Sequence, residues 1–135
     1  MYLSIEKNSR LFTSITLVLL CFFVFSNSTF AQSFSGSYSG PVDGGKGELI
    51  IEQIGNIINL KLTVGGAGCA GEIKSSGKLQ GNKAVLVKKE DDQECILTIN
   101  FKNDGVKIEE ESCSNFHSFS CSFSSYKGVF KRVKK

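Results

Sequence analysis

The chain has little of what metal and nucleic-acid sites require. Histidine occurs once, at position 117, and no Cys-x-x-Cys pair is present. The cysteine and histidine spacing of zinc sites is therefore missing, and we expect neither a metal nor another cofactor. The formal net charge is only +3 over 135 residues. Nucleic-acid binding usually needs a strongly basic face, so we expect no nucleic-acid partner.

An apolar run near the N-terminus is the first positive feature. Two basic residues precede the apolar stretch 11–25, and Thr29 and Ala31 are small residues at the −3 and −1 positions of a cut after residue 31. These are the parts of a secretory signal peptide. The run is shorter than the roughly 20 residues that cross a membrane as a helix. We therefore predict a cleavable signal peptide at 1–31, and a periplasmic or secreted product with no membrane span.

The remaining residues, 32–135, are long enough for one domain with a modest core. They keep fourteen Lys and Arg against twelve Asp and Glu, which gives a net charge of +2. They also keep four of the five cysteines: Cys69, Cys95, Cys113 and Cys121. An even number of cysteines in an exported chain predicts two disulfides.

Short β-rich runs alternate with turn residues throughout this domain. In 57–64 four aliphatic residues alternate with polar ones, as in a strand with one wet face. Asn103, Asp104 and Gly105 form a strong hairpin turn signal. We predict eight strands, at 34–40, 47–53, 57–64, 69–79, 83–89, 95–102, 106–112 and 122–133.

Short turns between successive strands make a meander. Eight such strands close naturally into an all-β, antiparallel up-and-down barrel, with a β-sandwich as the alternative. Neighbouring strands run in opposite directions, so all four cysteines are expected at one end of the barrel. Three pairings are possible. We favour Cys113–Cys121, which closes the shortest loop, together with Cys69–Cys95.

His117 is the one residue that suggests catalysis, because serines surround it in 114–120. A serine nucleophile also needs a group that orients the histidine and an oxyanion hole. No nucleophile-elbow sequence is present, so we predict a protein that is not an enzyme. A hydrolase using His117 is the less favoured alternative.

Phe116 and Phe119 flank His117 in the same cysteine-bounded loop. Exposed aromatic residues on a constrained loop are good anchors for a protein partner, because little entropy is lost on binding. We therefore take Phe116, His117 and Phe119 as candidate contact residues. The alternative is that the two phenylalanines plug the end of the barrel.

An eight-stranded barrel can also hold a small ligand. Lipocalins place a Gly-x-Trp in the first strand and avidins use several tryptophans, but this sequence contains no tryptophan. A small-ligand carrier is therefore the alternative function, and it requires an interior that is not filled by the protein's own side chains.

Ser35, Gly36 and Tyr38 begin the predicted domain. This start, the barrel pattern and the clustered cysteines resemble the bacterial periplasmic inhibitors of c-type and invertebrate-type lysozymes. In that family an SGxxY motif lies near the inhibitory surface, and here the spacing is Ser-Gly-x-Tyr. The resemblance implies an exported protein that blocks a lysozyme or another peptidoglycan hydrolase, with Ser35, Gly36 and Tyr38 near the contact. Because lysozymes are usually basic, the acidic blocks 90–94 and 109–111 would have to supply the complementary charge.

Overall fold

Strands form where apolar and polar residues alternate, because successive side chains of a strand point to opposite faces. The computed structural model describes residues 32–135, and the predicted signal peptide at 1–31 lies outside the described residues. Residues 33–135 form one compact unit. The strands are β1 (Gly36–Val42), β2 (Gly45–Ile54), β3 (Ile57–Gly66), β4 (Cys69–Gln80), β5 (Lys83–Glu90), β6 (Gln93–Lys102), β7 (Gly105–Glu111) and β8 (Lys131–Arg132).

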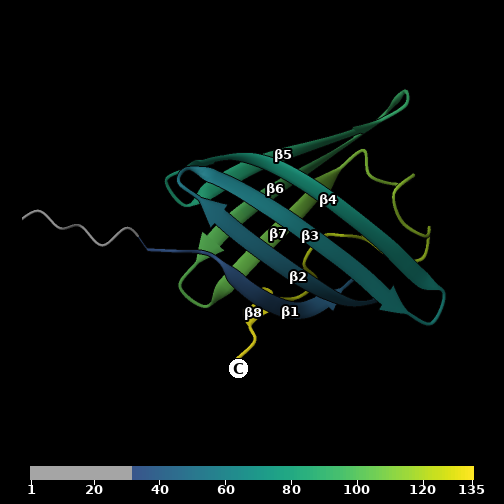
Figure 1. Cartoon of the computed structure of the whole chain (residues 1–135). Helices are drawn as coiled ribbons and strands as arrows, with labels where there is room; N and C mark the ends of the chain where they lie inside the picture. Colours follow the sequence, from purple (N-terminus) through teal and green to yellow (C-terminus); the bar gives the residue numbers. More distant parts are fainter. Residues whose placement is uncertain (1–31) are drawn as a thin grey trace, which may run out of the picture. The chain divides into compact units, whose positions relative to one another are not determined.

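The strands lie side by side in chain order, except that β8 pairs with β1. Phe130, just before β8, exchanges two backbone hydrogen bonds of 2.8 Å with Val106 of β7. The two ends of the meander are thus joined through the last residues of the chain. The result is a nearly closed, eight-stranded antiparallel barrel (Figure 1). The predicted all-β barrel is confirmed.

Strand β4 turns the sheet from one half of the barrel to the other. It pairs with β3 over ten residues, but with β5 only at Leu79↔Ala84 and Gln80↔Lys83. Glycine at two positions lets other segments approach β4 closely. A Cβ at Gly77 would collide with the carbonyl oxygen of Val85, and a Cβ at Gly71 would lie 2.6 Å from the Cβ of His117.

The interior of the barrel is filled by one continuous cluster of apolar side chains. Burial of this surface is the main favourable term for a domain of this size. The largest side chains that are completely buried are Phe123, Phe130, Leu49, Ile58, Leu62, Leu86, Leu97, Ile99 and Ile108. The described residues contain no helix that is long and apolar enough to cross a membrane.

The prediction of a long eighth strand at 122–133 is wrong, because β8 contains only Lys131–Arg132. The earlier part of this segment does lie along β7. The N–H of Ser125 donates to the carbonyl oxygen of Ile108 at 2.9 Å, but the N–H groups of β7 in this stretch donate to serine hydroxyls. The N–H of Ile108 donates to Ser125 Oγ at 2.9 Å, and the N–H of Glu110 donates to Ser124 Oγ at 3.0 Å. The chain also bends at 123–124, and Lys127 adopts a φ of 53°, so no regular strand forms here.

Both disulfides lie at the end of the barrel that carries the β1–β2, β3–β4 and β5–β6 turns. We call this end the disulfide pole. The disulfides are Cys69–Cys121 and Cys95–Cys113, so the predicted pairing of Cys69 with Cys95 and of Cys113 with Cys121 is wrong.

The strand order explains the observed pairing. Cys69 is on β4 and Cys95 is on β6, and β5 lies between them. Two strand spacings are about 9.5 Å, beyond the roughly 7 Å that a disulfide allows between Cα atoms. Strand β7 is the direct neighbour of β6, and therefore Cys113, just beyond the end of β7, meets Cys95.

Candidate functional site

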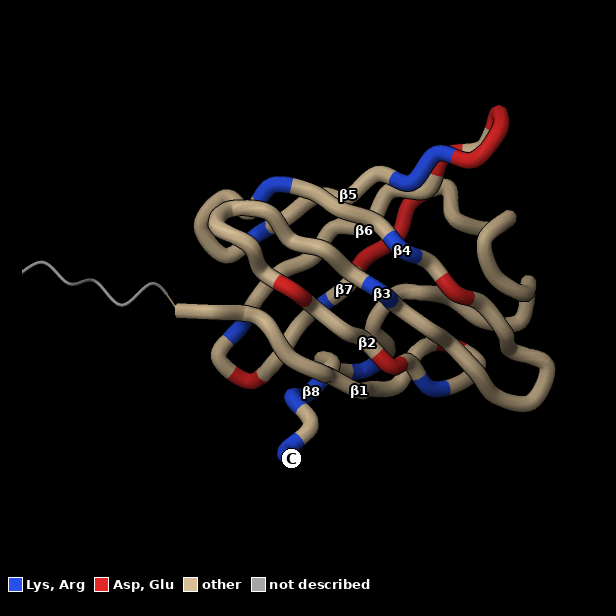
Figure 2. Tube along the Cα trace, viewed as in Figure 1, with Lys and Arg blue, Asp and Glu red and all other residues tan. Residues whose placement is uncertain are grey.

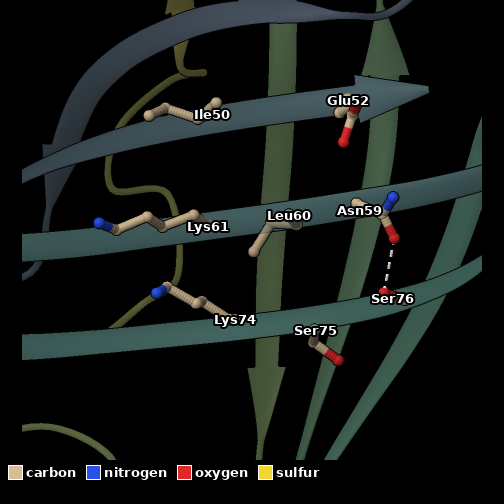
Figure 3. A pocket seen from close by; sticks show the side chains of 8 residues that line it. All are labelled: Ile50, Glu52, Asn59, Leu60, Lys61, Lys74, Ser75 and Ser76. Atoms are coloured by element: carbon tan, nitrogen blue, oxygen red, sulfur yellow. Dashed lines mark hydrogen bonds between the residues drawn. The ribbon is translucent and has the colours of Figure 1, made fainter.

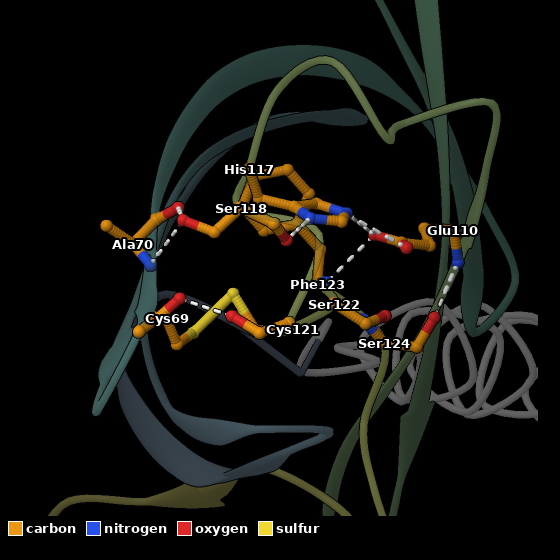
Figure 4. The surroundings of a disulfide bond; sticks show 11 residues. Cys69, Ala70, Glu110, His117, Ser118, Cys121, Ser122, Phe123 and Ser124 are labelled. Atoms are coloured by element: carbon orange, nitrogen blue, oxygen red, sulfur yellow. Dashed lines mark hydrogen bonds and ion pairs between the residues drawn. A yellow bond between two sulfur atoms is a disulfide. The ribbon is translucent and has the colours of Figure 1, made fainter.

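Residues 112–121 cross the disulfide pole, and we call this segment the pole loop. It starts at the end of β7, where Cys113 is bonded to Cys95 of β6. It ends on the far side at Cys121, which is bonded to Cys69 of β4. The loop is therefore cross-linked to the barrel at both of its ends, and Figure 4 shows the bond between Cys69 and Cys121.

Between the two disulfides the loop is hydrogen-bonded to the start of β4. The N–H of Ser118 donates to the carbonyl oxygen of Ala70 at 2.9 Å. The N–H of Ala70 donates to Ser118 Oγ at 3.1 Å, and Ser120 Oγ donates to the carbonyl oxygen of Gly68. An antiparallel bridge joins Gly71 and His117. These bonds dock the loop on the edge of β4 and hold its backbone in one conformation.

His117 fastens the middle of the loop to β7. Its Nε2 atom lies 3.1 Å from both carboxylate oxygens of Glu110, and its Nδ1 atom lies 2.8 Å from the carbonyl oxygen of Ser118 (Figure 4). The ring packs edge-on against Phe123, with 4.9 Å between ring centroids. The side chain of His117 is only 5% exposed. Both ring nitrogens contact oxygen atoms of neighbouring residues, so His117 is placed to anchor the loop.

The two phenylalanines of the pole loop have different surroundings. Phe116 is half-buried and packs against the core. Phe119 is 95% exposed, although the loop that carries it is cross-linked at both ends. Phe116 therefore helps to close the end of the barrel, whereas Phe119 is exposed to solvent and accessible to a partner.

Ser35, Gly36 and Tyr38 lie at the opposite pole of the barrel, where β1 begins. Tyr38 is 4% exposed; its hydroxyl donates to the carbonyl oxygen of Phe34 at 2.8 Å and accepts from Arg132 Nη2 at 2.7 Å. Burial raises the pKa of the Tyr38 phenol above its usual value of 10.0, and the guanidinium of Arg132 opposes this shift. The six predicted contact residues are thus not brought together, because they form two groups at opposite poles.

The turn between β5 and β6 gives the disulfide pole its charge. Glu90, Asp91, Asp92 and Glu94 lie at the tip of this hairpin, which projects away from the body of the barrel (Figure 2). The ion pair between Lys89 and Glu94, at 3.4 Å, neutralises only part of this charge. The disulfide pole therefore presents an acidic projection as well as an exposed aromatic side chain.

The hollow shown in Figure 3 lies on the outer face of β2, β3 and β4, not inside the barrel. Ile50 and Leu60 line it together with polar side chains. Ser76 Oγ donates to Asn59 Oδ1 at 2.7 Å, and Lys61 and Lys74 both pair with the nearby Glu72. The interior itself is occupied by the apolar cluster. Within 32–135, no three His, Cys, Asp or Glu side chains gather as a metal ion would require.

Glu110 is the site residue that the sequence analysis missed, since 109–111 was considered only as a block of acidic charge. It follows Val106 and Ile108 on the same face of β7, and both of those residues are fully buried. A carboxylate at an inward position needs a partner. The period-2 pattern of β7 was therefore a usable signal for the contact with His117.

Comparison with protein-family models, curated proteins and solved structures gave no match for this chain.

Proposed function

We propose that this protein is an exported binding protein that blocks another extracytoplasmic protein, of which a lysozyme or another cell-wall hydrolase is the first candidate. The observation that carries the proposal is the exposure of Phe119 on the doubly cross-linked pole loop. Two disulfides also suit an oxidising compartment outside the cytoplasm.

An exposed phenylalanine on a fixed loop is suited to binding. A large aromatic side chain in water gains free energy when it enters an apolar pocket of a partner. A loop that is already fixed loses little conformational entropy on association. His117, Ser118 and the two disulfides together provide this fixation. Phe119 thus has the properties of an interface hot spot, and the loop has those of a rigid support.

The acidic residues at the tip of the β5–β6 hairpin favour a basic partner. Glu90, Asp91, Asp92 and Glu94 project from the same pole as Phe119. Complementary charge increases the association rate and selects among partners more than it raises affinity. Lysozymes are usually basic, so this tip would favour their approach although the domain carries a net positive charge.

The experiment is a lysis assay. Residues 32–135 are mixed in excess with a panel of c-type and invertebrate-type lysozymes, and the clearing of a bacterial suspension is followed by turbidity. We expect lysis by at least one enzyme to be slowed. Phe119→Ala should weaken inhibition by about 30-fold or more, the effect of losing an interface hot spot.

The matched control is Ile54→Ala. Ile54 is 60% exposed and lies at the opposite pole, so its loss should leave inhibition unchanged. Unchanged lysis across the whole panel at excess protein would reject the lysozyme candidate. Equal losses from Phe119→Ala and Ile54→Ala would reject the pole loop as the contact surface.

A further inference from the structure

Although the net charge of the domain is small, its acidic and basic residues form two separate groups. Acidic residues lie at the tip of the β5–β6 hairpin, whereas the chain ends in Lys131, Arg132, Val133, Lys134 and Lys135 (Figure 2). Arg132 is used within the fold, because its guanidinium donates to Tyr38 and to the carbonyl oxygen of Ser35. Three lysines of the C-terminal end remain directed to solvent.

Strand β8 holds this basic end against the barrel. Lys131 lies opposite Ser39 of β1, and the N–H of Val133 donates to the carbonyl oxygen of Ser37 at 2.8 Å. Phe130 is completely buried, so the alternation of a strand directs the side chains of Lys131 and Val133 outward. Lys131 is therefore presented from a fixed strand, and Lys134 and Lys135 follow the hydrogen-bonded Val133.

Apolar residues are exposed among these charges. Val133 is 49% exposed and Ile50 is 53% exposed, and both line one groove on the outer face of β1, β2 and β3. Lys46 and Lys61 line the same groove, and Glu48 is its one acidic side chain. Basic residues interleaved with exposed aliphatic ones are typical of surfaces that adsorb to anionic lipid headgroups.

We propose that this outer surface adsorbs to an anionic phospholipid membrane. Its members, which we call the β8 face, are Lys46, Ile50, Lys131, Val133, Lys134 and Lys135. The lysines would attract the lipid phosphates, and the two aliphatic side chains would enter the headgroup region. A soluble polyanion would use the lysines but not Val133 or Ile50, and the exposed aliphatic residues therefore favour a membrane. The acidic hairpin tip would be repelled by the same membrane. This inference does not depend on the proposed inhibitory function.

The experiment is co-sedimentation of residues 32–135, which include the compact unit 33–135 and with it the whole described core. Vesicles of phosphatidylglycerol mixed with phosphatidylcholine are compared with vesicles of phosphatidylcholine alone. We expect binding only to the anionic vesicles, with loss of binding at high salt. Each lysine removed should weaken binding about fivefold, so Lys131→Gln, Lys134→Gln and Lys135→Gln together should weaken it about 100-fold.

The matched control replaces Lys78, Lys83 and Lys88 by glutamine. These residues lie on β4 and β5, away from the β8 face, and the control lowers the net charge equally. A second variant, Ile50→Ser with Val133→Ser, should weaken vesicle binding but leave binding to soluble polyphosphate unchanged. The proposal would be overturned if the protein did not bind the vesicles, or if the two lysine variants lost equal affinity. It would also be overturned if replacing Ile50 and Val133 left vesicle binding unchanged. Binding to polyphosphate alone would overturn it in favour of a soluble polyanion.

Discussion

The Nε2 atom of His117 lies 3.1 Å from both carboxylate oxygens of Glu110, and this contact joins the pole loop to the last inward-facing residue of β7. The same carboxylate accepts a hydrogen bond of 2.8 Å from the N–H of Phe123, just after the loop. The Glu110 side chain therefore holds the pole loop through His117, and it holds the residues just after the loop through Phe123. Phe119, which is 95% exposed, lies in this loop two residues after His117.

Replacement of Glu110 by alanine should destabilise the domain by about 2–3 kcal/mol, because it leaves the Phe123 N–H and the His117 ring without their acceptor in a largely buried place. Urea denaturation measures the loss. The control is Glu109→Ala, which removes a neighbouring carboxylate that is 58% exposed and pairs with Lys107. That change should cost less than about 1 kcal/mol. Equal costs for the two variants would contradict a supporting role for Glu110.

The disulfide pairing can be tested by peptide mapping without reduction. Lysines separate Cys69, Cys95 and Cys113 from one another, but no Lys or Arg lies between Cys113 and Cys121. Trypsin must therefore be combined with chymotrypsin, which cuts after Phe116 and Phe119. We expect linked peptides that contain Cys69 with Cys121 and Cys95 with Cys113. A peptide pair linking Cys69 to Cys95 would contradict the fold described above.

The two disulfides should differ in their contribution to stability. Cys69 and Cys121 are 52 residues apart, and Cys95 and Cys113 are 18 apart. The longer loop restricts the unfolded chain more, so replacing the first pair by serine should cost about 4 kcal/mol, against about 3 kcal/mol for the second. Thermal unfolding of the two double variants gives the comparison. The reverse order would show that loop entropy does not dominate here.

Tyr38 should ionise at higher pH than an ordinary tyrosine, because its burial raises the pKa of the phenol. The folded state then holds this proton more tightly than the unfolded state does. The stabilisation is complete below pH 10 and is lost as the pH rises through the folded pKa. The ultraviolet absorbance of tyrosinate, measured in the native protein and in Tyr38→Phe, isolates Tyr38 by difference. A difference curve centred at or below pH 10 would contradict the burial of this phenol.

Phe119 and Phe130 provide a matched pair for separating binding from folding. Phe130 is completely buried next to the closing strand, and Phe130→Ala should cost about 3–5 kcal/mol. Phe119 is 95% exposed, and Phe119→Ala should change stability by less than about 0.5 kcal/mol. Guanidinium denaturation of both variants tests the expectation. A large loss of stability in Phe119→Ala would mean that this side chain serves the fold.

The meander could be predicted because its signals are local. The alternation in β3 and β6 and the Asn103, Asp104 and Gly105 turn all depend on near neighbours in sequence. The predicted strand order already excluded a disulfide between Cys69 and Cys95, because β5 lies between their strands. The prediction instead favoured Cys113–Cys121 because that pair closes the shortest loop. Tyr38 was considered as a surface residue, although it shares its face of β1 with the buried Val42.

The path of the chain after β7 could not be predicted by pattern. Ser124 and Ser125 use their hydroxyl groups in place of backbone partners for β7, and a strand period does not encode that exchange. The pole loop depends on one carboxylate, two disulfides and a glycine at position 71 that admits His117. These are contacts between distant segments, and only the assembled barrel brings them together.

The hydrogen bond between Tyr38 and Arg132 joins residues that are 94 positions apart. Hairpins between consecutive strands can form early, since their partners are close in sequence, but closure must wait for the final residues. β8 follows the other seven strands in sequence, and until it pairs, the edges of β1 and β7 remain open to pairing with other chains. The docking of β8 therefore ends the interval in which the open sheet edges are most exposed to aggregation.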